Sequence, residues 1–108
     1  MQYLNPLVTQ QYLLESERMD RETSHFSFVK RDHPSYQEIL TMGRPAIILM
    51  LQEIRDDPSC HIWWRFEAIC EIAKAEGIEL MIIPRQNWGI AEQTRQYYIA
   101  WGKQHNLI

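Results

Sequence analysis

Cysteine, glycine and net charge are all scarce in this sequence, and each shortage narrows the possible functions. The 108 residues include two cysteines and four glycines, and the formal net charge is −3. The cysteines lie ten positions apart on one expected helix. That spacing is about 15 Å at the α-helical rise, so we predict two reduced, partly buried thiols and no disulfide. Without an excess of positive charge, nucleic acid is not the default partner.

Long hydrophobic runs are also missing. The longest apolar run, residues 46–51, is too short to cross a bilayer, and the first ten residues lack the basic start and apolar stretch of a signal peptide. We therefore expect a cytoplasmic protein with no membrane partner. Hydrophobic residues make up 45% of a chain long enough for one small core, which predicts a single helical domain over residues 1–108.

Cap residues and apolar spacing predict an all-α fold of four to five helices. Asn5 and Pro6 are typical of a helix start, and Ser35 with Glu38 forms a capping box for a second helix, which Gly43 ends. The central two helices should form an antiparallel pair in contact, because their connection is a short proline-containing turn. The expected helices span residues 5–20, 35–42, 45–57, 61–76 and 90–105.

Two segments between these helices are predicted to be extended. Residues 22–30 alternate polar and apolar side chains over too short a stretch to indicate a clear strand. Residues 78–84 are rich in aliphatic and β-branched side chains, yet a lone strand has no partner in a helical domain. We therefore predict an extended, buried connector there, followed by a turn at residues 85–89.

Residues 60–72 concentrate two tryptophans, a phenylalanine, two cysteines and a histidine, which suggests either a site or a core. At about 100° per residue, one face of this helix is apolar and predicted to be core. The residues of that face are Ile62, Phe66, Ile69 and Ala73. Trp63 projects instead beside Glu67 and Glu71. Either it lies under the connector or the C-terminal helix, or it is partly exposed and anchors a protein partner, as tryptophan often does at interface hot spots.

The preceding helix raises the same question at Leu49. This side chain points nearly opposite to the core face of its helix, which is formed by Ile47, Met50, Leu51 and Ile54. Either the N-terminal helix covers Leu49 or another chain does. The residues predicted to bind a protein partner are Leu49, Trp63, Trp64 and Glu67.

Residues 43–69 resemble one HEAT repeat. They contain a Gly-x-Pro-Ala start, an apolar helix, an Asp-Asp-Pro turn, and a second helix with an arginine and an Ala-Ile pair. A solenoid stacks several such units, and only one is present here. The resemblance therefore implies a HEAT-like helical pair and not a repeat protein.

A longer stretch, from residue 22 to residue 108, resembles a group of short bacterial and mobile-element proteins. The shared order is Glu-Thr-x-x-Phe-Ser, His-Pro-Ser-Tyr-Gln-Glu-Ile-Leu-x-Met-Gly, the Trp-rich helix, and the ending Tyr-Ile-Ala-Trp-Gly-Lys-Gln-His-Asn-Leu-Ile. Those proteins carry an Ile-Thr-Gly-x-x-Pro-Val type of turn, where this chain has Ile-Ala-Lys-Ala-Glu-Gly-Ile. The resemblance supplies no catalytic residue.

Side chains suited to catalysis or metal binding are few. Cys60 and His61 are neighbours that face different ways, and with Cys70 they lack the Cys-x-x-Cys spacing of a zinc site, so we predict no metal and no cofactor. An enzyme would have to use His33 as a general base or Cys70 as a nucleophile. Because Cys70 has no evident base, we assign no residue as catalytic.

A small basic-aromatic patch is the remaining candidate for chemistry, since single-stranded nucleic acid binds by charge and stacking. Its members are Arg21, Phe26, Phe28, Lys30, Arg31 and Arg44, and acidic residues interrupt them. The sequence therefore favours a non-catalytic protein–protein interaction module, an adaptor, inhibitor or regulator that binds another protein or itself. The alternatives are a nucleic-acid-associated accessory protein and a small enzyme that uses His33 or Cys70.

Overall fold

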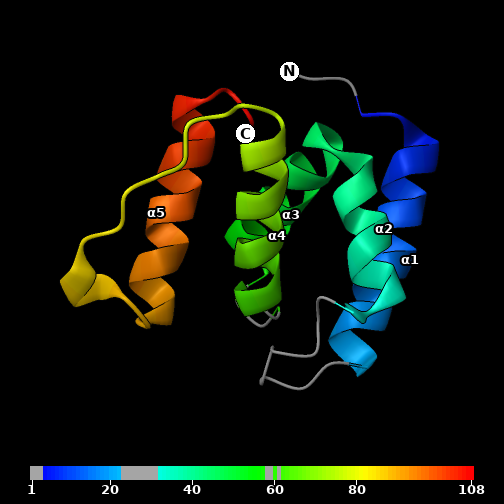
Figure 1. Cartoon of the computed structure of the whole chain (residues 1–108), viewed down its shortest axis with the longest axis horizontal. Helices are drawn as coiled ribbons and strands as arrows, with labels where there is room; N and C mark the ends of the chain where they lie inside the picture. Colours follow the sequence, from blue (N-terminus) through cyan, green and yellow to red (C-terminus); the bar gives the residue numbers. More distant parts are fainter. Residues whose placement is uncertain (1–3, 23–31, 58–59, 61) are drawn as a thin grey trace.

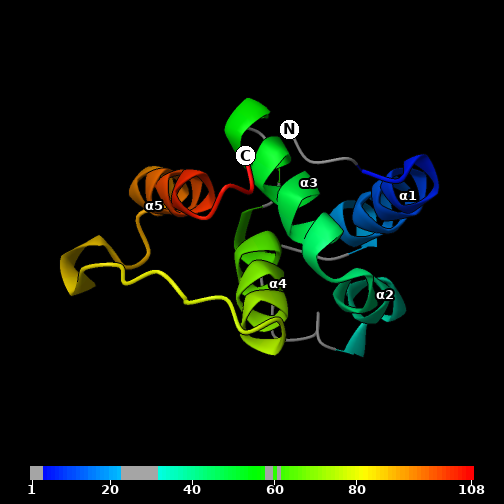
Figure 2. The same ribbon diagram turned by 90° about the horizontal axis from the view of Figure 1, so that it is seen from above.

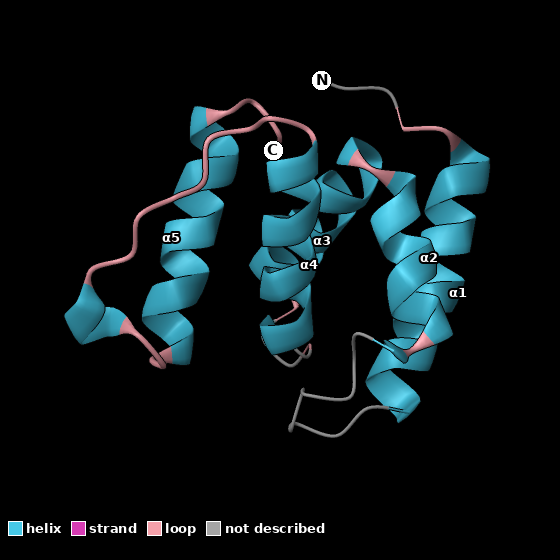
Figure 3. Ribbon diagram, in the orientation of Figure 1, coloured by secondary structure: helices cyan, strands magenta, loops and turns pink. Residues whose placement is uncertain are grey.

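The computed structural model describes residues 4–22, 32–57, 60 and 62–108. Over this part of the chain the fold is all-helical, with no strand (Figures 1 and 3). Its elements are α1 (Pro6–Glu22), α2 (Pro34–Met42), α3 (Arg44–Asp56), α4 (Ile62–Ala75), the short 3₁₀ helix η2 (Arg85–Asn87) and α5 (Ala91–Gln104). The prediction of a small all-α fold with four to five helices is confirmed, since the described residues form five α-helices. Of the predicted connector 22–30, Glu22 belongs to α1, and the rest lies outside the described residues.

The chain runs up and down through the molecule. In Figure 1 it descends along α1, ascends along α2, descends along α3 and ascends along α4. α3 slants across the other helices (Figure 2) and contacts all four of them. α5 also ascends, so residues 78–90 must first carry the chain back along the whole of α4. We call residues 78–90 the connecting arm.

The extended form of the connecting arm follows from this path. α4 has 14 residues, or about 21 Å at 1.5 Å per residue. Seven extended residues cover about 23 Å, whereas seven helical residues would cover only about half of that distance. The β-branched and aliphatic composition of residues 78–84 suits the extended conformation.

The start of α2 differs from the predicted capping box. Helix α2 begins at Pro34, and the ring Nδ1 of His33 accepts a hydrogen bond of 3.1 Å from the backbone N–H of Ser35. The predicted N-cap at Ser35 is wrong because proline fits the first turn of a helix, which makes the residue before it the cap. The C-terminal end of α2 is as predicted, since Gly43 adopts a φ of +71° there.

Six consecutive residues of α3, Ala46–Leu51, are buried. Leu49 is among them at 7% exposure, and it lines a small cleft together with Tyr12 and Leu13 of α1. The N-terminal helix therefore covers Leu49, which is the first of the two predicted alternatives, and Leu49 is not available to a protein partner. On another side of α3, a Cβ added to Gly102 of α5 would lie 2.8 Å from the Cδ1 of Leu51, so glycine lets these two helices approach closely.

The arginine of the Trp-rich stretch is buried in the core. Arg65 is 1% exposed, and its guanidinium donates two hydrogen bonds of 2.8 Å to the carboxylate of Asp20 and one of 3.0 Å to Glu53. Trp64 donates its indole N–H to Asp20 at 2.9 Å, and the Tyr12 hydroxyl donates to Glu53. These five residues, which we call the Arg65 network, join α1, α3 and α4.

The environment in the Arg65 network also explains the pKa shifts of Arg65 and Tyr12. Burial alone lowers the pKa of Arg65, but the hydrogen bonds to Asp20 and the negative charge of Glu53 outweigh it, so the net shift is upward. Burial also raises the pKa of Tyr12. Arg65 is therefore charged and Tyr12 neutral at neutral pH.

We expect Arg65→Ala to lower the free energy of unfolding by about 2–4 kcal/mol, because it removes a buried side chain and leaves two half-buried carboxylates without their cation. Arg21→Ala is the matched control. The Arg21 side chain is 60% exposed and pairs at 3.4 Å with Glu17, which is also exposed, so its loss should change stability by less than about 0.5 kcal/mol. Urea unfolding followed by circular dichroism measures both, and equal effects of the two substitutions would contradict the role given to the Arg65 network.

Candidate functional site

The structure does not bring the four predicted interaction residues onto one face. Leu49 and Trp64 are buried, at 7% and 3% exposure, and both face α1. Trp63 is 39% exposed and Glu67 is half-buried. The predicted surface fails because α1 packs against one side of the α3–α4 pair, while Trp63 projects elsewhere. The interaction role of Trp63 and Glu67 stays a prediction.

Trp63 begins a row of aromatic rings that leads from α4 to α5. Its ring meets Phe66 edge-on at a centroid distance of 5.6 Å, and Phe66 stacks on Tyr98 of α5 at 4.2 Å. The predicted core face of α4 is confirmed by the burial of Phe66 with Ile62, Ile69 and Ala73. The Trp-rich stretch is therefore mainly core, and Trp63 is the ring at its exposed end.

The two residues considered for catalysis both have structural contacts. His33 caps α2 through Nδ1, and its Nε2 lies 3.3 Å from Glu22. The Sγ of Cys70 lies 3.0 Å from the hydroxyl of Tyr98, and burial raises the pKa of both groups. A raised thiol pKa reduces the fraction of nucleophilic thiolate at neutral pH.

The basic-aromatic patch is only partly within the described residues. Arg21 lies in the last turn of α1 and pairs with Glu17 at 3.4 Å, and Arg44 begins α3. Phe26, Phe28, Lys30 and Arg31 lie outside the described residues, as does His61 of the Cys60–His61 pair.

Where the structure describes the chain, no three His, Cys, Asp or Glu side chains gather as possible metal ligands. None of the described helices is both long and apolar enough to cross a membrane.

A surface that the sequence did not predict lies on the connecting arm. Eight large hydrophobic residues are exposed in the described part of the chain, and four of them fall within residues 80–90. These four are Leu80 (40%), Ile82 (89%), Trp88 (66%) and Ile90 (43%). This concentration of exposed apolar residues in one short segment makes the arm a candidate interaction site.

The connecting arm is extended, as predicted, but it is only half covered. Ile78, Met81 and Ile83 pack against the core, whereas Leu80 and Ile82 are exposed. The predicted burial is therefore wrong for Leu80 and Ile82. An extended segment turns alternate side chains to opposite faces, and the domain supplies a packing surface for one face alone.

Hydrogen bonds hold the connecting arm in place. The indole N–H of Trp101 on α5 donates to the carbonyl of Glu79 at 2.7 Å, and Asn87 donates its side-chain N–H to the Tyr97 hydroxyl at 3.1 Å. Within the arm, the indole N–H of Trp88 donates to the carbonyl of Ile83 at 3.0 Å. The backbone of the arm, which carries the exposed side chains, is therefore fixed at both ends.

Trp88 is the most prominent ring on this surface. Its N–H bond to Ile83 fixes the indole while 66% of the residue stays exposed. The guanidinium of Arg85 lies 5.9 Å from the ring centroid, within reach of a cation–π interaction. A fixed tryptophan beside an arginine has the composition typical of interface hot spots.

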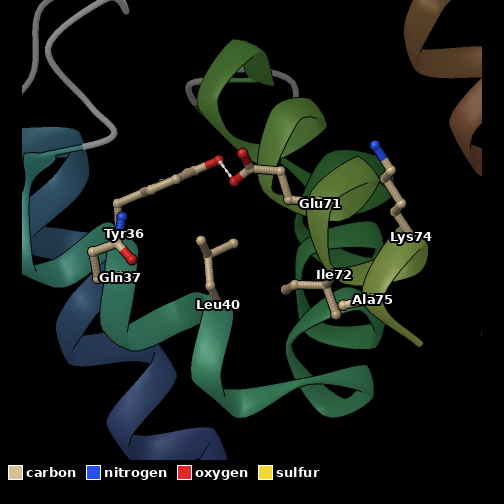
Figure 4. Close-up of a pocket in the computed structure, with 7 residues that line it drawn as sticks. All are labelled: Tyr36, Gln37, Leu40, Glu71, Ile72, Lys74 and Ala75. Carbon is tan, nitrogen blue, oxygen red and sulfur yellow. Dashed lines mark hydrogen bonds between the residues drawn. The ribbon is translucent and has the colours of Figure 1, made fainter.

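A cleft of about 460 Å³ lies between α2 and α4 (Figure 4). Leu40 and Ile72 point toward each other across its apolar floor, and the Tyr36 hydroxyl donates to Glu71 at 2.5 Å at one end. Gln37, Lys74 and Ala75 complete the described lining.

Comparison of the chain with protein-family models, with curated proteins and with solved structures finds no match. The resemblance to one HEAT repeat and the resemblance to short bacterial and mobile-element proteins therefore stay predictions.

Trp63 and Trp64 are neighbours that should respond differently to truncation. Trp64→Ala removes a buried ring and its hydrogen bond to Asp20, so we expect a loss of about 3–5 kcal/mol in the free energy of unfolding. Trp63→Ala removes a partly exposed ring and one edge-on aromatic pair, which predicts a loss of about 1–2 kcal/mol. Thermal and urea unfolding compare the two variants. A larger loss for Trp63→Ala would show that Trp63 belongs to the core.

The raised pKa of Tyr98 predicts a loss of stability at alkaline pH. The folded state keeps this hydroxyl protonated, while in the unfolded chain it ionises near pH 10. The stabilising effect is complete below about pH 10 and decreases as the pH rises toward the folded-state value, by about 1.4 kcal/mol at pH 11. Tyr98→Phe removes this contribution, so its unfolding free energy should fall less between pH 9 and about pH 11. Identical pH profiles of the two proteins would contradict the assignment.

Proposed function

We propose that this chain is a non-catalytic protein–protein interaction module whose main binding surface is the connecting arm. The observation that supports the proposal is the concentration of exposed apolar residues between Leu80 and Ile90, which includes a tryptophan held in place beside an arginine. The partner is another protein or a second copy of the chain. An adaptor, inhibitor or regulator of a bacterium or mobile element, acting in the cytoplasm, fits both this surface and the resemblances.

The way the arm is held favours binding by a preformed surface. Trp101 and Asn87 anchor its two ends to α5, and Trp88 is fixed by its own hydrogen bond. A residue that is already ordered loses little conformational entropy when a partner binds. Binding through the Trp88 indole should therefore cost little conformational entropy.

The HEAT-like pair serves as support in this proposal. α3 and α4 are in contact, and α5 packs on both of them. The arm leaves the C-terminal end of α4 and enters the N-terminal end of α5 (Figure 1), so the same helices fix its two ends. Binding by a loop segment on a rigid helical scaffold is a common arrangement in interaction domains.

We expect Trp88→Ala to weaken association with the partner by about 2 kcal/mol, roughly 30-fold, since hot-spot tryptophans have effects of this size. Folding should be unaffected because the ring is 66% exposed. Leu7→Ala is the matched control, since Leu7 is 74% exposed on α1, away from the arm.

The partner is first captured with the wild-type chain from the organism that encodes it, and affinities are then measured by calorimetry. A partner that binds wild type and Trp88→Ala equally well would overturn the arm as the binding surface. A melting temperature that falls only in Trp88→Ala would show that the ring stabilises the fold instead.

A further inference from the structure

We propose that two copies of this chain associate through their connecting arms, with residues 80–82 of each copy paired as antiparallel β-strands. The inference rests on the proposed function and names its partner as a second copy. It uses a part of the arm different from Trp88, namely the backbone edge at Leu80 and Ile82.

The backbone of this segment is open. Within the described residues, no backbone hydrogen bond involves the N–H or C=O groups of Leu80, Met81 or Ile82. The carbonyls of Glu79 and Ile83, on either side, already accept indole N–H groups. In an extended chain alternate residues direct their N–H and C=O groups to the same edge. The edge formed by Leu80 and Ile82 is therefore the unoccupied one.

A second copy can form hydrogen bonds with all the free backbone N–H and C=O groups of this edge. If two arms meet antiparallel about a two-fold axis at Met81, Leu80 of each copy lies opposite Ile82 of the other. In this register Leu80 and Ile82 form hydrogen-bonded pairs that exchange both N–H and C=O groups, and Met81 faces its own counterpart in a non-hydrogen-bonded pair. Each free backbone group of the edge then has a partner, with no residue left over.

The side chains fit the same register. Leu80 and Ile82 are 40% and 89% exposed, and pairing places the four aliphatic side chains of two copies beside one another on one face. Glu79 lies opposite Ile83 of the other copy, so the two Glu79 carboxylates do not face each other. The segment is therefore complementary to itself in backbone and apolar surface.

The position of the arm permits this pairing. The arm is the outermost described segment on its side of the molecule (Figure 2). Proline and charged side chains help to keep natural edge strands from pairing, and residues 80–82 contain neither.

The expected dimer is weak. Stable interfaces bury roughly 1,200–2,000 Å² in total, and three residues of strand with their neighbours bury less, so we expect a dissociation constant on the order of 100 μM. Sedimentation velocity from about 10 μM to about 1 mM should show a shift from monomer to dimer. Over the same range, the amides of Leu80 and Ile82 should become protected from hydrogen exchange, while the amide of Met81 should not.

Ile82→Pro and Ile82→Val form a matched pair of variants. Proline keeps an apolar side chain and an extended φ but removes the N–H, so the dimer should weaken at least about 10-fold. Valine keeps the N–H and the branched side chain, and its dimer should stay within about 3-fold of wild type. Because Ile82 is 89% exposed, neither change should alter the melting temperature of the monomer.

A chain that stays monomeric up to about 1 mM overturns self-pairing, as does a dimer that Ile82→Pro leaves unchanged. If the chain is monomeric but loses a captured partner on Trp88→Ala, self-pairing is wrong and the proposed function stands. If the dimer forms as described and Trp88→Ala has no effect on any captured protein, the second copy is the arm's partner and binding to another protein is overturned.

Discussion

The burial of one cation constrains the whole domain. Arg65 is 1% exposed, and an unpaired guanidinium at that position would cost several kcal/mol. Asp20 and Glu53 remove this penalty only if α1 and α3 bring their carboxylates next to Arg65 of α4. The two hydrogen bonds from Arg65 to Asp20 fix both the distance and the orientation between the two side chains. Trp64 and Tyr12 bind the same carboxylates. The position of α1 therefore depends on these polar contacts as well as on the packing of its apolar residues.

Because of this constraint, the central helix pair α3–α4 packs against α1 on one side and against α5 on another. With α1 held against α3 and α4 by the Arg65 network, Leu49 is covered from the N-terminal side. α5 packs against α3 at Gly102 and meets the aromatic row of α4 at Phe66 and Tyr98. Trp63 is left at the exposed end of that row. Trp63 and Trp64 are adjacent in sequence but lie in different packing environments, so the two tryptophans do not form one exposed surface.

Local signals in the sequence predict the helices well and their partners poorly. Gly43 ends α2 as expected, because one positive φ is decided by its own residue. The run Ala46–Leu51 is apolar on every side, so periodicity cannot show which helix covers Leu49. Arg65 looks like an ordinary surface charge, since its partners Asp20 and Glu53 lie 45 and 12 positions away. The exposed arm had a detectable signal, a β-prone run in a helical chain, but the lack of a strand partner also fits a buried connector.

The open edge of the connecting arm follows from the order of the helices. Because α4 and α5 run in the same direction, the chain must return along α4 before α5 begins, and an extended segment covers that distance with the fewest residues. A lone extended segment on a helical domain packs one face and leaves its outer backbone edge without a strand. A helical return would need about twice as many residues. The fold therefore retains this edge for as long as it keeps the parallel arrangement of α4 and α5, whether or not a second chain is present to pair with it.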